Sequence, residues 1–261
     1  MRNEARGFCP FNDLAIAADL LATLGLRRVA IVDIDAHHGD GTQSLLYDQE
    51  VLKISLHQYD GKYFPGTGQI AEVGWGNGHG LSVNVPLPRS LGEAAYLEAF
   101  RAIVPSSVRA FAPDVLIANF GVDGHYADRL SRLGLGTAAY RALAASLHAL
   151  AHETCDGRLI LTGSGGYNPE AVSKCWSVLL ATLTRAMEVP TEIALAMHDT
   201  STSDHQLVIA EVLRSLRGSR WWPGAFASLQ DCPPEPSSGA ADECRRVVAA
   251  VTAQVLPLRL V

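Results

Sequence analysis

The sequence predicts one α/β fold built around a mainly parallel sheet. Along residues 1–187, short apolar runs rich in Val, Ile and Leu alternate with helical patterns, as in sheets whose strands are joined by crossover helices. The length of 261 residues suits one such domain, because α/β folds of about 250 residues often remain undivided. Hydrophobic residues make up 48% of the chain and charged residues 18%, a composition that can form a large core.

The first predicted helix is capped by Asn12 or Asp13 and runs to about Leu24. Its apolar face is formed by Leu14, Ala17, Ala18 and Leu21. No segment before this helix can cover that face. The pattern therefore favours a chain that begins inside its domain.

The remaining elements follow from apolar runs and helical periodicity. Strands are expected at residues 29–34, 51–57, 81–85, 115–120 and 159–161, the last being buried, and helices at residues 93–111, 137–155, 168–187 and 244–255. Pro86 and Pro88 close the third strand, and Pro113 ends the helix at residues 93–111. Thr137 is a candidate helix cap, and Pro169 occupies a favoured first helical position.

The composition changes after residue 187. Residues 188–261 are expected to form a C-terminal extension that packs on the same domain and ends in the last predicted helix. Trp221 and Trp222 either pack onto the core or form an exposed patch, and packing is the favoured alternative.

Charge and cysteine content exclude several classes of protein. A net charge of −6 argues against a nucleic-acid or membrane-surface binder, which usually carries a basic face. No apolar run approaches the roughly 18 residues of a membrane span, and the N-terminus has no secretory signal pattern. The five cysteines include no CxxC pair, which is typical of reduced thiols in a cytoplasmic protein.

The first candidate functional motif is residues 33–41, Asp-Ile-Asp-Ala-His-His-Gly-Asp-Gly, at the end of a predicted buried strand. Side chains two residues apart share a face, so Asp35 and His37 can converge just past the strand end. One carboxylate and one imidazole suit Zn²⁺, or Fe²⁺ as an alternative. The alternative without a metal is a turn in which the Asp and His side chains cap backbone groups.

Two further strand ends carry compatible groups. Asp123 follows the strand at residues 115–120 and could supply a third ligand, or only cap a turn, while His125 is expected beside the ligands or at the rim. Tyr167 follows the glycine-rich run after residue 161, and its phenol could donate to a developing oxyanion. A phosphate-binding loop lacks its lysine here, and a purely structural Gly-Tyr turn is the other alternative. Three such strand ends together favour one shared site.

These motifs resemble the zinc-dependent histone deacetylase superfamily, and most closely its bacterial acetoin-utilisation branch. The resemblance covers residues 7–187, and its blocks keep the family's order and spacing. The matching blocks are residues 7–9, 33–41, 55–57, 64–68, 84–86, 123–130 and 163–168. The resemblance implies an arginase-deacetylase-like α/β fold of three layers, with residues 1–187 as the C-terminal portion of a deacetylase catalytic domain that lacks its N-terminal part.

Carried over residue by residue, the resemblance implies these roles. The metal ligands are Asp35, His37 and Asp123, and Tyr167 polarises the acetyl carbonyl. The substrate channel is lined by Gly7, Phe8, Phe64 and Gly165. A structural K⁺ is held by Asp33, Asp35, His37, Ser55 and Leu56, through side chains and carbonyls.

The chain departs from the family at one important place. The family has a His-His-Ala segment just before the position of Met1, which supplies the general base and proton shuttle, whereas no histidine precedes His37 here. Asp33 and Asp40 resemble the carboxylates that orient those histidines, and they are expected to lack these histidine partners. Smaller differences, at Val122, Gly124 and Ser164, surround intact functional residues.

The implied reaction is hydrolysis of acetyl-lysine-type amides to acetate and a free amine, with the activity of this chain left open. One alternative is a ureohydrolase of the same fold with two manganese ions, which would need a second Asp-x-Asp pair. Another is a module that binds metal or acyl-amine without turnover. Acetylpolyamines or other small acyl-amines could replace acetyl-lysine as substrate.

Overall fold

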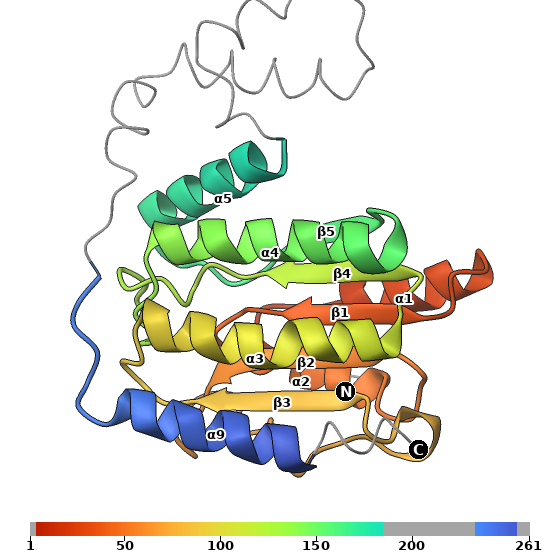
Figure 1. Cartoon of the computed structure of the whole chain (residues 1–261), viewed down its shortest axis with the longest axis horizontal. Helices are drawn as coiled ribbons and strands as arrows, with labels where there is room; N and C mark the ends of the chain where they lie inside the picture. Colours follow the sequence, from red (N-terminus) through yellow and green to blue (C-terminus); the bar gives the residue numbers. More distant parts are fainter. Residues whose placement is uncertain (1–3, 185–232, 255–261) are drawn as a thin grey trace, which may run out of the picture.

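The computed structural model describes residues 4–184 and 233–254. Its centre is a five-stranded, entirely parallel sheet in the order β3-β2-β1-β4-β5 (Figure 1). The strands are β1 Val29–Asp33, β2 Leu52–Gln58, β3 Ser82–Leu87, β4 Val115–Phe120 and β5 Leu159–Gly163. From β1 the chain builds the sheet first toward β3 and then, through β4, in the opposite direction. The carboxyl ends of β1 and β4 therefore form a topological switch point, the usual place for a site in such sheets.

Helices lie on both faces of this sheet, which gives three layers (Figure 1). They are α1 Asp13–Thr23, α2 Asp40–Leu45, α3 Glu93–Phe111, α4 Thr137–Cys155, α5 Pro169–Leu183 and α9 Ala240–Gln254, with a 3₁₀ turn at Gly76–Gly78. The predicted three-layer fold of the arginase-deacetylase type agrees with this arrangement.

Strand β1 contributes to two separate apolar cores. In β1, Ala30 and Val32 point into the core under α3 and α4, whereas Val29 and Ile31 point into the smaller core under α1. This alternation follows from the two-residue period of a strand. Because both faces are covered, β1 is fully buried, and its end is a rigid base for the polar residues that follow.

The start of α1 confirms the predicted cap, since the Asn12 side chain accepts a hydrogen bond from the backbone N–H of Ala15 (2.8 Å). The apolar face, for which no preceding segment offered a partner, is covered by later strands. Leu14 and Ala18 are buried in the smaller core against β1 and β4. The partner comes from strands later in the chain, which a search of the preceding residues alone could not find.

Other boundaries differ from the prediction for local reasons. Pro86, expected to close the third strand, lies inside β3 and pairs with His57. Strand β3 is an edge strand of the described sheet, and an edge strand tolerates a residue without an N–H. Gly136, not Thr137, is the cap of α4. Strand β5 is only partly buried, although a buried strand was expected. Helix α2 was not predicted, because its six residues show no apolar period.

The described end of the extension is a helix, as predicted. Helix α9 packs against α3 and β3, with Cys244 and Val251 buried in the main core. The predicted positions of Trp221, Trp222 and the end of the helix at residue 187 lie outside the described residues. Among the described residues no helix has the length and apolarity to cross a bilayer. The four cysteines of the described ranges are free thiols.

Candidate metal centre

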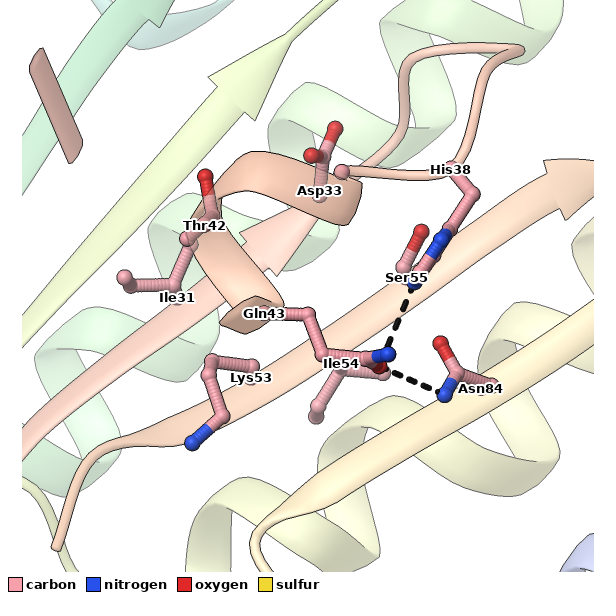
Figure 2. A pocket seen from close by; sticks show the side chains of 10 residues that line it. Ile31, Asp33, His38, Thr42, Gln43, Lys53, Ile54, Ser55 and Asn84 are labelled. Carbon is pink, nitrogen blue, oxygen red and sulfur yellow. Dashed lines mark hydrogen bonds between the residues drawn. The ribbon is translucent and has the colours of Figure 1, made fainter. Parts of the chain in front are cut away.

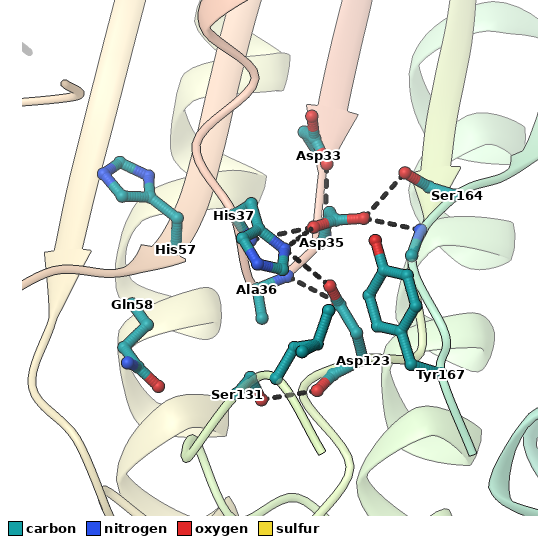
Figure 3. Close-up of polar contacts among 12 residues, drawn as sticks. Asp33, Asp35, Ala36, His37, His57, Gln58, Asp123, Ser131, Ser164 and Tyr167 are labelled. Atoms are coloured by element: carbon teal, nitrogen blue, oxygen red, sulfur yellow. Dashed lines mark hydrogen bonds and ion pairs between the residues drawn. The ribbon is translucent and has the colours of Figure 1, made fainter. Parts of the chain in front are cut away.

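Three segments that are distant in sequence meet at the carboxyl end of the sheet (Figure 3). Asp35 and His37 follow β1, Asp123 follows β4, and Ser164 and Gly165 follow β5. The parallel pairing of β1 with β4, which aligns Asp33 with Asn119, brings the first two strand ends together. Pairing of β4 with β5 adds the third. Sheet order thus converts three separate motifs into one site.

Asp35, His37 and Asp123 form a compact triad at this point. His37 Nδ1 lies 3.0 Å from Asp35 Oδ1 and 2.7 Å from Asp123 Oδ2. The three potential ligand atoms all lie within 4.8 Å of one another, and no other group of three such residues occurs within the described ranges. The predicted convergence of these residues is therefore present in the structure.

Backbone and hydroxyl donors hold the two carboxylates in place. Asp35 Oδ2 accepts hydrogen bonds from Ser164 Oγ and Gly165 N, both at 2.7 Å. Asp123 Oδ1 accepts one from Ala36 N at 2.8 Å, and Ser131 Oγ donates to the Asp123 carbonyl (Figure 3). These bonds fix the carboxylates before any ligand arrives.

Gly165 is a glycine for steric reasons. A Cβ atom at this position would lie 2.6 Å from Asp35 Oδ2 and even closer to Asp123 Oδ2. The sequence resemblance placed Gly165 along the substrate channel. In the structure it lies directly against the two carboxylates, where only a bare backbone can approach so closely.

Burial and mutual interaction shift the pKa values of the triad. Burial favours protonated Asp35, but hydrogen bonds and attraction from His37 outweigh it and hold the pKa of Asp35 at about 2. Burial likewise opposes the charged form of His37, yet hydrogen bonds with Asp123 and Asp35 raise its pKa to about 10. Burial and repulsion from Asp35 raise the pKa of Asp123 to about 7. The raised pKa of His37 reflects a proton held between the two carboxylates.

The donor set fits a divalent metal ion. Carboxylate oxygens and imidazole nitrogens both bind zinc, and catalytic zinc sites have three protein ligands and keep a further position for water or substrate. Without an ion, two buried carboxylates share one imidazole, an arrangement whose excess negative charge a cation would neutralise.

Tyr167 stands beside the triad (Figure 3). Its ring meets that of His37 edge to face, with centroids 6.3 Å apart. Burial, followed by the charges of Asp123 and Asp35, raises the pKa of Tyr167 above its ordinary value. The phenol therefore keeps its proton at neutral pH and can act as a hydrogen-bond donor.

The predicted channel residues surround the approach to the triad. Gly7 and Phe8 both have positive φ and lie in a tight turn closed by paired backbone hydrogen bonds between Arg6 and Cys9. The turn exposes Phe8 (83%) and brings its ring to 6.0 Å from that of Tyr167. The ring of Phe64 lies 6.2 Å from that of His37. Two partly or fully exposed aromatic side chains thus lie close to the triad and Tyr167.

Asp33 and Asp40, expected without their histidine partners, bond to other groups of the chain. Asp33 Oδ1 accepts hydrogen bonds from Asn119 Nδ2 (2.9 Å) and from Asp35 N (3.0 Å). Burial, and next the charge of Asp35, raise its pKa well above the ordinary value. Asp40 forms an ion pair with Arg6 at 3.0 Å. The N-terminal turn brings Arg6 to Asp40, a contact that no local pattern reveals.

A small cavity of about 20 Å³ lies between β1, α2, β2 and β3 (Figure 2). It is lined in part by Asp33, His38, Ser55 and Asn84. This volume holds about one water molecule and is too small for a substrate. Ser55 pairs with Asp33 across β1 and β2, so two of the residues predicted to hold K⁺ are neighbours.

Sequence reasoning missed Tyr63, and of the two positions expected for His125 the structure excludes the rim. Tyr63 Oη lies 2.9 Å from His37 Nε2, although Tyr63 precedes Phe64 in a block that was matched only from residue 64 onward. The signal was a second aromatic residue directly beside a predicted channel wall. His125 is buried, not at the rim, and its ring stacks on Tyr126.

Comparison with known proteins decides the family. A model of the histone deacetylase domain matches residues 1–183, which include every residue of the triad and Tyr167. The chain belongs to the histone deacetylase family. The resemblance predicted from the motifs is confirmed by this match.

Several members of the histone deacetylase family are similar to this chain. The acetoin utilization protein AcuC of Bacillus subtilis is 40% identical over 181 residues, which cover 67% of this chain and 47% of AcuC. A probable deacetylase of Archaeoglobus fulgidus is 41% identical over 165 residues, which cover 63% of this chain and 45% of the relative. The chain therefore spans less than half the length of these relatives.

Solved histone deacetylase structures agree with the fold. A histone deacetylase homologue in complex with SAHA superimposes with a TM-score of 0.71 at 27% identity, covering 95% of this chain and 63% of that one. The HD domain of HDA15 gives 0.65 at 30% identity, covering 87% and 61%. The predicted arginase-deacetylase-like fold is thereby confirmed.

Proposed function

We propose that this chain carries the metal-binding part of a deacetylase that hydrolyses acetyl-lysine-type amides to acetate and a free amine. The observation that carries the proposal is the triad of Asp35, His37 and Asp123 with the protonated phenol of Tyr167 beside it. A family match over residues 1–183 supports the same reaction class.

We infer that Asp35, His37 and Asp123 hold one Zn²⁺, with Fe²⁺ as the alternative. A bound divalent ion supplies Lewis-acid polarisation of the amide carbonyl and makes water more acidic. A K⁺ ion at Asp33, Asp35, His37, Ser55 and Leu56 is part of the proposal by resemblance. Its positive charge would offset the buried carboxylate of Asp33.

The chain's own side chains perform the other roles. Tyr167 donates its phenolic hydrogen bond to the oxygen that becomes negatively charged as the amide is attacked, a contribution of about 3–4 kcal/mol in comparable sites. Phe8 and Phe64 hold the apolar stem of the substrate between their rings and keep water away from it. Asp33 and Asp40 act through their partners to fix the segments around the site.

The substrate class we propose is an acetylated lysine or another acyl-amine. The two exposed aromatic rings suit a narrow apolar stem, which acetyl-lysine and acetylpolyamines share. From the net charge we expect no direct nucleic-acid or membrane partner. From the free thiols we expect a cytoplasmic location.

Acetate release from an acetyl-lysine peptide tests the proposal. We expect turnover only with Zn²⁺ or Fe²⁺ added, one ion per chain, and a kcat about 10²–10³-fold lower in Tyr167→Phe. Tyr140→Phe, which alters a buried tyrosine of the core outside the triad, is the matched control.

Two other outcomes separate the alternatives. Tight binding of a hydroxamate with no acetate release would favour a binding module for this chain, since a hydroxamate needs the metal but no general base. Two ions per chain would favour the ureohydrolase alternative and overturn the single-metal mechanism. The one triad present within the described ranges argues for a single ion.

A further inference from the structure

The imidazole of His37 is held from both of its nitrogen atoms. Nδ1 faces the two carboxylates of the triad, at 3.0 Å from Asp35 and 2.7 Å from Asp123. Nε2 faces the hydroxyl of Tyr63 at 2.9 Å. The ring of Tyr63 also stacks on that of His37, with centroids 4.9 Å apart and planes inclined by 17°.

We propose that Tyr63 is a positioning residue of the metal site, an inference that rests on the proposed function. Tyr63 fixes the ring of His37 so that Nδ1, and not Nε2, serves as the metal ligand. A histidine ligand generally has its second ring nitrogen hydrogen-bonded, and that bond sets the tautomer and the ring orientation. Tyr63 is the hydrogen-bond partner of this second nitrogen, a role that the sequence motifs did not assign to it.

The chemistry of a phenol suits this position in both states of the site. When Nδ1 binds a metal, the ring proton resides on Nε2, and Tyr63 Oη accepts it as a hydrogen bond. The same hydrogen bond forms in the metal-free site whenever Nε2 carries a proton. Burial, followed by the charges of Asp123 and Asp35, raises the pKa of Tyr63, so the phenol stays neutral.

The loop that carries Tyr63 is itself anchored. Asp60 Oδ1 accepts hydrogen bonds from Tyr63 N (2.7 Å) and Lys62 N (3.0 Å), which sets the turn just before the ring. Further along, Glu72 accepts bonds from Gly68 N and Gln69 N, at about 3 Å each. Both ends of the loop are thus tied by carboxylates, so the position of Tyr63 is set without a contact from substrate.

Tyr63→Phe tests the proposal, because it keeps the stacked ring and removes only the hydroxyl. We expect Zn²⁺ affinity, measured by competition with a chromophoric chelator, to fall about 10–100-fold. Tyr47→Phe, at the opposite end of the sheet from the triad, is the matched control and should bind Zn²⁺ as the unaltered chain does. Equal affinity of Tyr63→Phe and the unaltered chain would overturn the proposal.

Imidazole ¹⁵N–¹H spectra give a second readout that needs no activity and no metal. In the metal-free chain we expect a slowly exchanging Nε2–H signal of His37, held by Tyr63 Oη, and in Tyr63→Phe faster exchange of this proton with solvent. An unchanged His37 spectrum in Tyr63→Phe would contradict the positioning role. If the unaltered chain binds no Zn²⁺, the proposed function fails, and the metal-free spectra still decide the role of Tyr63.

Discussion

The carboxylate of Asp128 accepts a hydrogen bond from the backbone N–H of Tyr167, with Oδ2 and N 2.7 Å apart. Its other oxygen accepts one from Leu130 N at 2.8 Å. Beside this pair, Asn168 Nδ2 donates to the Ala127 carbonyl at 2.9 Å. The loop after β4, which carries Asp123, is thereby tied to the loop after β5, which carries Tyr167.

Replacing Asp128 by Ala should therefore affect both stability and catalysis. Two backbone N–H groups would lose their acceptor, at a cost of about 1–3 kcal/mol in the free energy of unfolding. Tyr167 would be less well positioned, so we expect kcat to fall more than Zn²⁺ affinity. Asp48→Ala, at an exposed site, is the control for urea denaturation and acetate-release assays. A variant of Asp128 with normal kcat would contradict this link.

Gly165→Ala should displace the carboxylates of the triad. Its Cβ would lie 2.6 Å from Asp35 Oδ2, so either the loop or the carboxylate must move, at a cost of about 1–3 kcal/mol. The matched control is Gly163→Ala, whose Cβ would make only a 3.4 Å contact with Trp176. Zn²⁺ affinity and thermal denaturation measure the difference. Equal behaviour of the two variants would show that the loop adjusts freely.

Metal binding should release protons. In the metal-free chain the pKa of His37 is about 10, so the ring is protonated near neutral pH, and this proton must leave before Nδ1 can bind a metal. Apparent Zn²⁺ affinity should therefore rise with pH, by up to about tenfold per unit for one proton released. Calorimetry in buffers of different ionisation enthalpy counts the protons. Affinity that is constant between about pH 6 and 8 would disagree with this assignment.

His57 should make the fold sensitive to acid. Burial, followed by the nearby His38, lowers the pKa of His57 to about 3, while an unfolded chain titrates near 6.5. Below pH of about 6.5 the unfolded state takes up a proton that the folded state excludes. Stability present above that pH is therefore lost as the pH falls toward about 3, by at most ~1.4 kcal/mol per unit.

Urea denaturation at several pH values checks this prediction. His57→Gln can still donate to the Gly68 carbonyl, which accepts from His57 Nε2 at 3.0 Å, but it does not titrate. We expect the variant to lose less stability between about pH 6 and 4 than the unaltered chain. Parallel curves for the two proteins would assign the acid sensitivity to other groups.

A general base should raise the rate of the reaction. The family resemblance places a His-His-Ala segment just before the position of Met1, and general-base catalysis is worth about 10²–10⁴-fold. We expect a chain that carries such a segment ahead of Met1 to release acetate faster by about this factor, with unchanged Zn²⁺ affinity. An equally slow extended chain would show that the base is supplied elsewhere.

The elements and the ligand types could be read from the sequence. Apolar alternation and proline positions placed β1, β4 and α3 almost to the residue, because these signals act between close neighbours in the chain. The spacing of Asp35 and His37 was equally informative, since residues two apart past a strand end face the same way. With the motif order around Asp123 and Tyr167, this was enough to predict the family.

Only the tertiary structure decided which side chains meet. The order β3-β2-β1-β4-β5 sets which strand ends are neighbours, and that order depends on packing across the whole sheet, not on local preference. The contacts of Tyr63 with His37, Asp128 with Tyr167 and Arg6 with Asp40 join residues 26 or more positions apart. The sequence by itself determined the chemistry available to this protein, and the fold determined which groups act together.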